Sequence, residues 1–443
     1  MSKLSGDFEV VDQAHQLDMD YVSEHMQAVM TLPGTGEKSY ADTSSIDEML
    51  EAMPNLEWVG IVVSWFTTGL DIANDIIKPG IEKNSGESED DWLVSSYDRT
   101  NAHQIYRSNQ LDPTTVRYGG TAPDSDVLSY IQEIKDKGLK VAFYPFIMVD
   151  DVSKSWRGSI TGDAEDVSNF YKKQYKPFIM HYAGLLKDVI DMFYIGSELQ
   201  GLTSIKGDGR EFPFVGCLVD LASSVRSEVG DGVLISYAAN WTEYHSCLGG
   251  YRPLDTLWSN QNIDFVGVDY YMPLTNSEEM DLSVEEIKAG FYSGEGYDYY
   301  LNYTGEEIEF NNNCDRLKDV AGWFSSDHWA WDPEVEESYK TSWVAKSKKV
   351  IFSEFGFRSI ELASNTPNVY GDVMPRHSSG NVDFPMQMRA IRATLEHISE
   401  DQSIEMGFCY GWDSRGSGWT RNYADGDRWA KGHWIDGKIV RIK

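Results

Sequence analysis

Residues 123–147, PDSDVLSYIQEIKDKGLKVAFYPFI, contain one complete helix and strand in a short space. Pro123 and Asp124 are a typical helix start, apolar residues recur at helical spacing through 125–137, and Gly138 is a typical helix end. The run that follows, Leu139–Ile147, is rich in aromatic and β-branched side chains, as expected of a buried strand. A single glycine separates the predicted helix from the predicted strand. This short connection indicates a chain of alternating α and β elements.

The same alternation continues in both directions from this unit. Seven further apolar runs are expected to be strands: Ala28–Pro33, Trp58–Phe66, Met192–Glu198, Val233–Ala239, Ile263–Tyr271, Val350–Phe355 and Ile404–Trp412. Helices are expected at Ser45–Met53, Ser125–Lys137, Glu165–Ile190, Pro213–Val229 and Met386–Ile398. Eight strands separated by helices predict a fold of the α/β class, a (β/α)8 TIM barrel.

The domain organisation follows from the position of these elements. We expect a single barrel over residues 26–443 and an N-terminal arm or linker over residues 1–25, which are polar and show no clear pattern. The connections 67–124 and 272–346 are too long for bare barrel loops. We expect them, and the loop 150–160, to lie on the face where the strands end, because functional insertions in barrels gather there.

Charge and composition exclude several classes of function. The 443 residues include 71 acidic and 38 basic side chains, a formal charge of −33, so a partner made of nucleic acid is not expected. No apolar stretch reaches the roughly 18 residues of a membrane helix, and the start MSKLSGDFEV lacks the apolar centre of a signal peptide. We therefore expect cytoplasmic synthesis and no membrane insertion. The four cysteines match no zinc-ligand spacing, so no metal or other cofactor is expected.

Two glutamates stand at the ends of strong apolar runs. Glu198 ends Phe193-Tyr194-Ile195-Gly196-Ser197-Glu198, and Glu354 lies in Val350-Ile351-Phe352-Ser353-Glu354-Phe355-Gly356. They belong to the fourth and seventh predicted strands, and barrel enzymes carry their chemistry at such strand ends. Two carboxyl groups that face one substrate can divide the work of a glycosidase, one as proton donor and one as nucleophile.

Other polar and aromatic residues share this predicted rim. Each of them alone is more often part of a core than of a binding site. Together they mix flat rings with amide and carboxylate groups, which is typical of a carbohydrate-binding cleft. The expected substrate-binding residues at strand ends are Trp65, Tyr144, Tyr237, Asn240, Trp241, Tyr270, Tyr271, Trp412 and Asp413.

The sequence also resembles a known family. The strings LPGTGE, VVSWF, YGGTAPDSDV, YPFIMVD, SWRGSI, IGSELQGLT, SYAANWTEY, LWSNQNIDFVGVDYYMPL, GEGYDYY, SEFGF, NTPNVY, GWDSRGSGW and WAKGHWIDGKI occur in order. Over roughly residues 28–440 the chain resembles the TIM-barrel-like domain of the large tail-tip (host-specificity) protein of gene transfer agents and tailed phages. That domain is similar to retaining two-glutamate (β/α)8 glycoside hydrolases, in particular endo-β-mannanases with W-R-G, I-G-(S/T)-E-L and (S/T)-E-x-G strings.

The resemblance implies a role for single residues. Glu198 matches the acid/base and Glu354 the nucleophile, while Trp156 and Arg157 match a loop that borders the sugar subsites. Tyr271 matches a tyrosine near the nucleophile. Many relatives have Asn before the acid/base where this chain has Ser197, which puts the usual contact to the sugar 2-hydroxyl in question.

A retaining mechanism implies two further expectations. The two carboxyl groups should lie about 5–5.5 Å apart, against roughly 6.5–9.5 Å in an inverting enzyme. Glu198 should have the raised pKa of a proton donor, and the hydroxyl of Tyr271 should help to keep Glu354 ionised.

Three functions remain open from the sequence. The first is a retaining, endo-acting β-glycosidase in a virion or gene transfer agent tail, with a polysaccharide or cell-wall glycan and other tail-tip proteins as partners. The second is a catalytically silent glycan-binding or structural tail-hub module. The third is a stand-alone cellular enzyme of the endo-β-mannanase type. The intact glutamate pair favours activity, and the order of motifs favours the tail protein.

Overall fold

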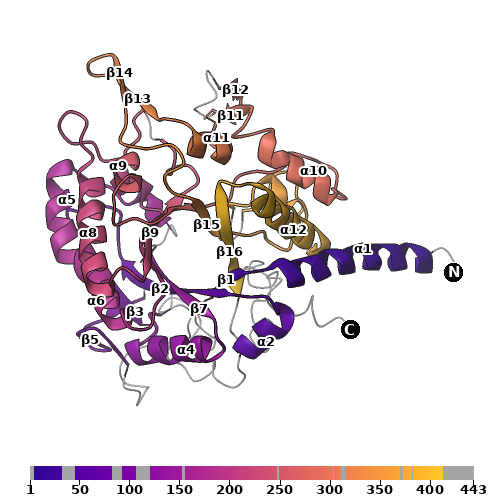
Figure 1. Ribbon diagram of the computed structural model, residues 1–443, viewed down its shortest axis with the longest axis horizontal. Helices are drawn as coiled ribbons and strands as arrows, with labels where there is room; N and C mark the ends of the chain where they lie inside the picture. The colour runs from indigo at the N-terminus through magenta and orange to yellow at the C-terminus, as the bar shows by residue number, and fades with distance from the viewer. Residues whose placement is uncertain are drawn as a thin grey trace.

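The computed structural model describes residues 4–31, 45–81, 92–105, 120–151, 155–246, 249–302, 304–310, 316–369, 373–381 and 383–412. Eight parallel strands form a closed ring in which β1 pairs with both β2 and β16 (Figure 1). The strands are β1 (Ala28–Thr31), β2 (Trp58–Thr67), β7 (Lys140–Val149), β8 (Met192–Ser197), β9 (Leu234–Asn240), β10 (Val266–Asp269), β15 (Val350–Phe355) and β16 (Ile404–Trp412). The predicted (β/α)8 barrel is confirmed.

Helices surround the ring of strands (Figure 1). The main ones are α2 (Ser45–Ala52), α4 (Asp124–Asp136), α5 (Ala164–Phe170), α6 (Lys176–Leu186), α8 (Pro213–Val229) and α12 (Phe384–Glu400), with shorter helices α7 (Gln200–Thr203), α9 (Asp255–Trp258), α10 (Val284–Ala289) and α11 (Val320–Ser325). The helix predicted over 165–190 is divided by a π-helical turn at Tyr171–Tyr175. After α4 the chain turns at Gly138, whose φ of +81° few residues other than glycine adopt.

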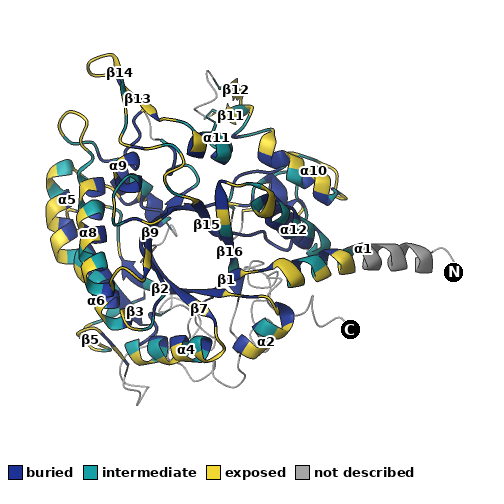
Figure 2. Ribbon diagram, viewed as in Figure 1, coloured by how far each residue is buried: buried dark blue, intermediate teal, exposed yellow. Residues whose placement is uncertain are grey.

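Each barrel strand is buried on two sides, as Figure 2 shows for the ring. Along β7, Val141 and Phe143 belong to the core between strands and helices, whereas Ala142, Tyr144 and Phe146 belong to the core inside the barrel. This alternation follows from the two-residue period of a strand. Burial on both sides explains why the strands appear in the sequence as nearly continuous apolar runs.

The two long connections attach to the barrel at the ends of the strands, as expected. β3 (Lys78–Ile81) pairs with the last part of β2 and also with β6 (His103–Gln104), and a small pair, β4 (Leu93–Val94) and β5 (Tyr97–Asp98), follows β3. The segment after β10 carries two hairpins, β11 (Tyr299–Leu301) with β12 (Glu307–Glu309) and β13 (Trp329–Asp332) with β14 (Glu337–Lys340). The hydroxyl of Tyr244, in the connection after β9, donates to the carbonyl of Leu317 in this segment at 2.6 Å.

The N-terminal stretch expected to be an arm or linker contains a helix, α1 (Leu4–His25). Its last turns lie against α12, where Arg392 forms an ion pair with Asp18 at 3.0 Å and lies over the ring of Tyr21. The division between an arm and a barrel domain stays a prediction. In the described ranges, no helix is both long and apolar enough to cross a membrane.

Candidate active site

The turn that follows β8 presents Glu198. Its φ of +50° is unusual for a residue with a side chain, and its N–H donates to the carbonyl of Ala238 on β9 at 2.8 Å. Ser197 donates through its hydroxyl to the carbonyl of Pro145 on β7 at 3.0 Å. Glu198 is thus held by both neighbouring strands in a backbone conformation that is typical of functional sites.

Three side chains donate hydrogen bonds to the carboxylate of Glu198. Arg157 and Trp156 reach Oε2, each at 2.8 Å, and Asn240 reaches Oε1 at 2.6 Å. Arg157 is itself fixed, because its Nε donates to the carbonyl of Ser197 at 3.2 Å and its guanidinium lies 3.9 Å from the ring centre of Phe146. Burial acts to lower the pKa of Arg157, but the nearby carboxylates outweigh it and the pKa is raised. A permanent positive charge therefore stands beside Glu198.

Glu354 lies in β15 and is also buried. The hydroxyl of Tyr271 donates to its Oε2 at 2.8 Å, and within the described residues Oε1 has no hydrogen-bond partner. Burial and, next, the charge of Glu198 raise the pKa of Glu354 to about 7, while Arg157 and Tyr271 act to lower it. The charge of Glu198 thus opposes the ionisation of Glu354.

From the sequence, Tyr271 was expected to help keep Glu354 ionised, and that expectation needs correction, because the pKa of Glu354 is raised. Arg157, Trp156 and Asn240 all donate to Glu198, whereas Glu354 has a single donor from a neutral hydroxyl. Hydrogen bonds to a carboxylate favour its charged form. The hydrogen bond from Tyr271 does not offset burial and the charge of Glu198, which raise the pKa of Glu354.

The pKa of Glu354 should make folding stability depend on pH. An unfolded glutamate has a pKa near 4.3, whereas the folded pKa of Glu354 is about 7. Glu354 therefore stabilises the fold below the unfolded pKa, and this stabilisation is lost as pH rises through about 7. Glu354→Gln should remove this loss. Melting temperatures from pH 5 to 8.5 should therefore show the variant gaining on the wild type as pH rises. Parallel profiles would contradict the assignment, and exposed Glu279→Gln is the matched control.

Asp269, at the end of β10, is another buried carboxyl group, and the sequence did not single it out. The hydroxyl of Tyr144 lies 2.6 and 2.7 Å from the two carboxyl oxygens of Asp269, and Ser353 donates to Oδ1 at 2.7 Å. Burial and the charges of Glu354 and Glu198 raise the pKa of Asp269 well above its usual range. Its position at a strand end, directly before Tyr270, is the signal that could have identified it.

Glu243 is also buried, and the sequence did not single it out either. Its Oε1 accepts from Tyr237 at 2.9 Å and from Thr203 at 2.6 Å, and its Oε2 accepts from the backbone N–H of Asn240 at 3.0 Å. The hydroxyl of Tyr237 in turn accepts from the N–H of Leu199 at 2.6 Å. Burial raises the pKa of Glu243 to about 7 against these hydrogen bonds. Glu243 thus holds Asn240, a donor to Glu198, and reaches the residue after Glu198.

The structure separates the predicted site residues into two groups. Trp156, Arg157, Asn240 and Tyr271 surround the two glutamates, and Tyr144 lies inside the barrel against Asp269. Tyr237 is fully buried and supports the site through Glu243.

The side chains of two further predicted residues lie in the core, although the backbone N–H of one of them, Tyr270, donates to the carbonyl of Glu354 at 2.7 Å. Trp65 is in the core, where its Nε1 donates to Tyr182 at 3.0 Å, and Tyr270 stacks on Phe352 with ring centres 4.3 Å apart. These two were expected on the rim and instead point toward the helices. Trp412 is buried at the end of β16 and Trp241 is half-buried against the core, while Asp413 lies outside the described residues.

Two family models match the chain. The model described as the GTA TIM-barrel-like domain matches residues 173–413, a range that includes both glutamates. The model of Glycoside Hydrolase Family 113 matches residues 95–211, which include Trp156, Arg157 and Glu198. No curated protein matches the sequence.

Solved structures agree with the models on the fold. A GH113 β-1,4-mannanase in a complex has 13% identity and a TM-score of 0.53 over 94% of this chain and 100% of that chain. The GH113 β-mannanase AaManA from Alicyclobacillus acidocaldarius, in complex with ManMIm, has 15% identity and a TM-score of 0.52 over 95% of this chain and 98% of that chain. At these identities the structures establish a shared fold. The Family 113 model supports a glycoside hydrolase.

Proposed function

The chain belongs to the family of GTA TIM-barrel-like domains, and on this premise we propose that it is a retaining glycoside hydrolase of a gene transfer agent or phage tail tip. Its substrate is a polysaccharide of the host surface or cell wall. The observation that carries the proposal is the pair of buried carboxyl groups, Glu198 and Glu354, at the ends of two barrel strands.

The geometry around Glu354 suits a nucleophile. Tyr271 holds Oε2, and Oε1 accepts no hydrogen bond within the described residues, so Oε1 is the atom available to attack the anomeric carbon. Attack gives a glycosyl ester on Glu354 as the bond to the leaving oxygen breaks. The hydroxyl of Tyr271 stabilises the charged form of Glu354 that this step consumes and the next step restores.

Glu198 moves the proton in both steps. It protonates the leaving oxygen as the sugar bond breaks, and it then takes a proton from the water that hydrolyses the ester. Asn240 fixes Oε1, while Trp156 and Arg157 fix Oε2. Arg157 stabilises the carboxylate that forms when the proton leaves Glu198.

Screening β-mannans, β-glucans and peptidoglycan for released reducing ends tests the proposed reaction. We expect at least one polymer to be cleaved by the wild type and none by Glu354→Gln. Glycan binding without cleavage would favour the silent module. Immunolabelling tests the tail-tip role separately. Antibodies against the chain should label the tail ends of purified particles. If no particle is labelled, a stand-alone enzyme is favoured.

Glu243 should act as a positioning residue for Glu198. Glu243→Gln puts an amide donor where the carboxylate accepts from Tyr237, Thr203 or the N–H of Asn240, and one such mismatch costs about 1–3 kcal/mol. We expect kcat to fall about 10- to 100-fold with KM nearly unchanged, because the alignment of Glu198 changes and the sugar contacts do not.

Steady-state kinetics on the cleaved polymer measure this effect. Exposed Glu211→Gln is the control and should match the wild type. If Glu243→Gln instead raised KM at constant kcat, or lowered activity only in proportion to the unfolded fraction, the positioning role would be refuted.

A further inference from the structure

The β13–β14 hairpin carries two exposed tryptophans. Trp329 is 59% exposed and Trp331 is 43% exposed, and they lie on one face of the hairpin because they are two residues apart. Their cross-strand partners, Lys340 and Ser338, are on the same face and are also exposed. In Figure 1 the hairpin projects outward from the barrel beyond α9. Two large rings, a hydroxyl and an ammonium group thus face solvent together.

The opposite face of the hairpin is fixed to the barrel. Asp332 is buried, accepts from Tyr251 at 2.9 Å and forms an ion pair with Arg210 at 2.7 Å. The guanidinium of Arg210 lies 4.1 Å from the ring centre of Tyr339 and also reaches Glu337 at 3.1 Å. These contacts come from the connections after β8 and β9. The hairpin therefore has a defined inner face and a defined outer face.

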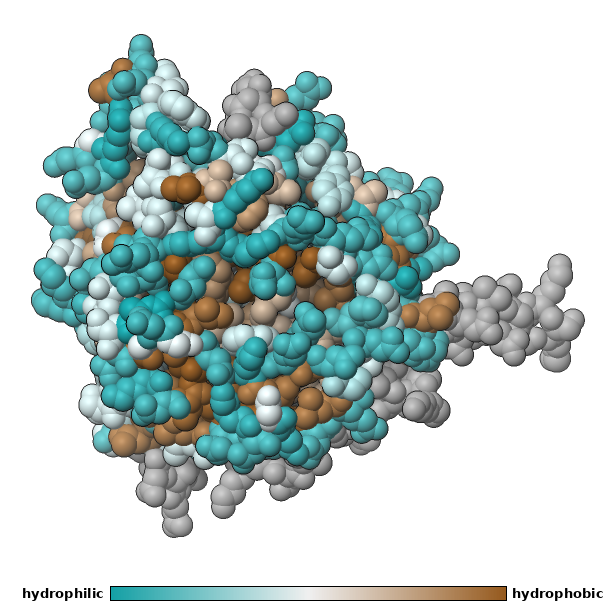
Figure 3. Space-filling view, viewed as in Figure 1, coloured by the Kyte–Doolittle hydropathy of each residue, from teal (hydrophilic) through white to brown (hydrophobic). Residues whose placement is uncertain are grey.

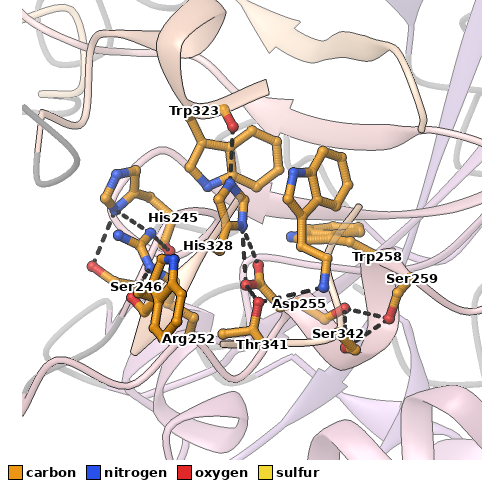
Figure 4. Close-up of polar contacts among 12 residues, drawn as sticks. His245, Ser246, Arg252, Asp255, Trp258, Ser259, Trp323, His328, Thr341 and Ser342 are labelled. Atoms are coloured by element: carbon orange, nitrogen blue, oxygen red, sulfur yellow. Dashed lines mark hydrogen bonds and ion pairs between the residues drawn. The ribbon is translucent and has the colours of Figure 1, made fainter. Parts of the chain in front are cut away.

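The base of the hairpin is held by a buried polar cluster, shown in Figure 4. Asp255 accepts from Thr341 at 2.5 Å and lies 3.0 Å from Nδ1 of His328, so one carboxylate ties together the two ends of the hairpin. Arg252 donates to the carbonyl of Trp329 at 3.0 Å. Rigid support of this kind lowers the entropy cost of presenting the two indole rings to a ligand.

We propose that the outer face of this hairpin is a second glycan-binding surface, which holds a neutral polysaccharide chain apart from the catalytic glutamates. The two indoles offer flat apolar faces for the CH faces of sugar rings. The hydroxyl of Ser338 and the ammonium group of Lys340, which also pairs with Asp327 at 2.7 Å, supply hydrogen bonds to hydroxyl groups. The choice of ligand class rests on the proposed function. Glu334, Glu336 and Glu337 in and beside the turn are exposed, so their charges disfavour an anionic polymer.

The size of the surface argues against a protein partner. Two indoles bury about 150–250 Å² each, which falls short of the roughly 800 Å² that each side of a standard protein interface contributes. Figure 3 shows the projecting hairpin as mostly hydrophilic, with a small apolar area near its tip. The surface fits a narrow chain that contacts few residues at a time.

Native gel electrophoresis through soluble polysaccharide tests this surface without turnover. Every protein carries Glu354→Gln, and the gels contain galactomannan, mixed-linkage β-glucan or, as an anionic polymer, alginate. We expect a neutral polymer to slow the parent protein and Trp329→Ala/Trp331→Ala to weaken that affinity about tenfold or more. Trp329→Phe/Trp331→Phe should keep most of the affinity because a ring remains at each position. Tyr300→Ala changes an exposed ring on the β11–β12 hairpin and should have no effect.

Three results would contradict the proposed binding surface. The double alanine variant could be slowed as much as the parent protein, or neither neutral polymer could slow the parent protein. The alanines could also change only self-association, which sedimentation measures. Melting temperatures of the variants control for folding. If binding depends on the two tryptophans but the wild type cleaves no polymer, the hydrolase proposal fails and the binding surface stands.

Discussion

Glu354→Gln should lower the rate of glycan hydrolysis by about 10⁴-fold or more, because it removes the nucleophile. Gln keeps the size of the side chain and can still accept the hydrogen bond from Tyr271. Glycan affinity, measured by calorimetry with the cleaved polymer, should therefore stay within a few-fold of the wild type. The loss is expected in kcat.

The exposed glutamate Glu279 provides the matched control, since Glu279→Gln makes the same chemical change at a solvent-exposed position. It should retain wild-type kinetics. Full activity in Glu354→Gln would show that another group is the nucleophile. A loss of folding, seen as a lower melting temperature at pH 5, would point to a structural role instead.

Glu198→Ala should slow hydrolysis by about 10²- to 10⁴-fold on polysaccharide, where the leaving oxygen needs a proton. Aryl glycosides with acidic phenol leaving groups need no proton, so their first step should be nearly unaffected. Their second step lacks a base, and added azide should restore the rate by attacking the ester directly. Initial rates on the two substrate types, with and without azide, measure the difference.

An equal loss on both substrate types would contradict the acid/base role of Glu198. The substitution also leaves the guanidinium of Arg157 without its carboxylate partner in a buried place, which costs stability. Glu198→Gln keeps the size of the side chain and serves as the second variant. It should show the same dependence on the leaving group.

The barrel could be predicted because its strands are buried on both sides. β7 and β8 are nearly continuous apolar runs, so they stand out from the amphipathic helices between strands. The hairpins of the long insertions could not be predicted in this way. β13 and β14 are four residues each and show no repeating apolar pattern. They are held by ion pairs of Asp332 and Glu337 with Arg210, which lies more than 100 residues earlier in the sequence.

The site was only partly predictable for a related reason. The rule that functional side chains lie at strand ends identified Glu198, Glu354 and Asn240, but it does not say which residues of a strand point inward. Trp65 and Tyr270 stand at positions of β2 and just after β10 that face the helices, so they became core residues. Successive side chains of a strand point to opposite faces. The structure shows which of them point into the barrel and which point toward the helices.

Glu243 shows the opposite failure. It lies in a turn three residues after the end of β9, where no apolar pattern marks it. Its role depends on Thr203 and Leu199, which come from the connection after β8. Only the three-dimensional arrangement brings these groups to one carboxylate.

The stereochemistry of the first product tests the central claim most directly. Proton NMR, recorded during the first minutes of cleavage of a β-linked polymer, distinguishes the anomer released by the enzyme before it equilibrates. Double displacement through Glu354 predicts that the β anomer forms first. Release of the α anomer first would show inversion and would contradict the proposed roles of Glu198 and Glu354.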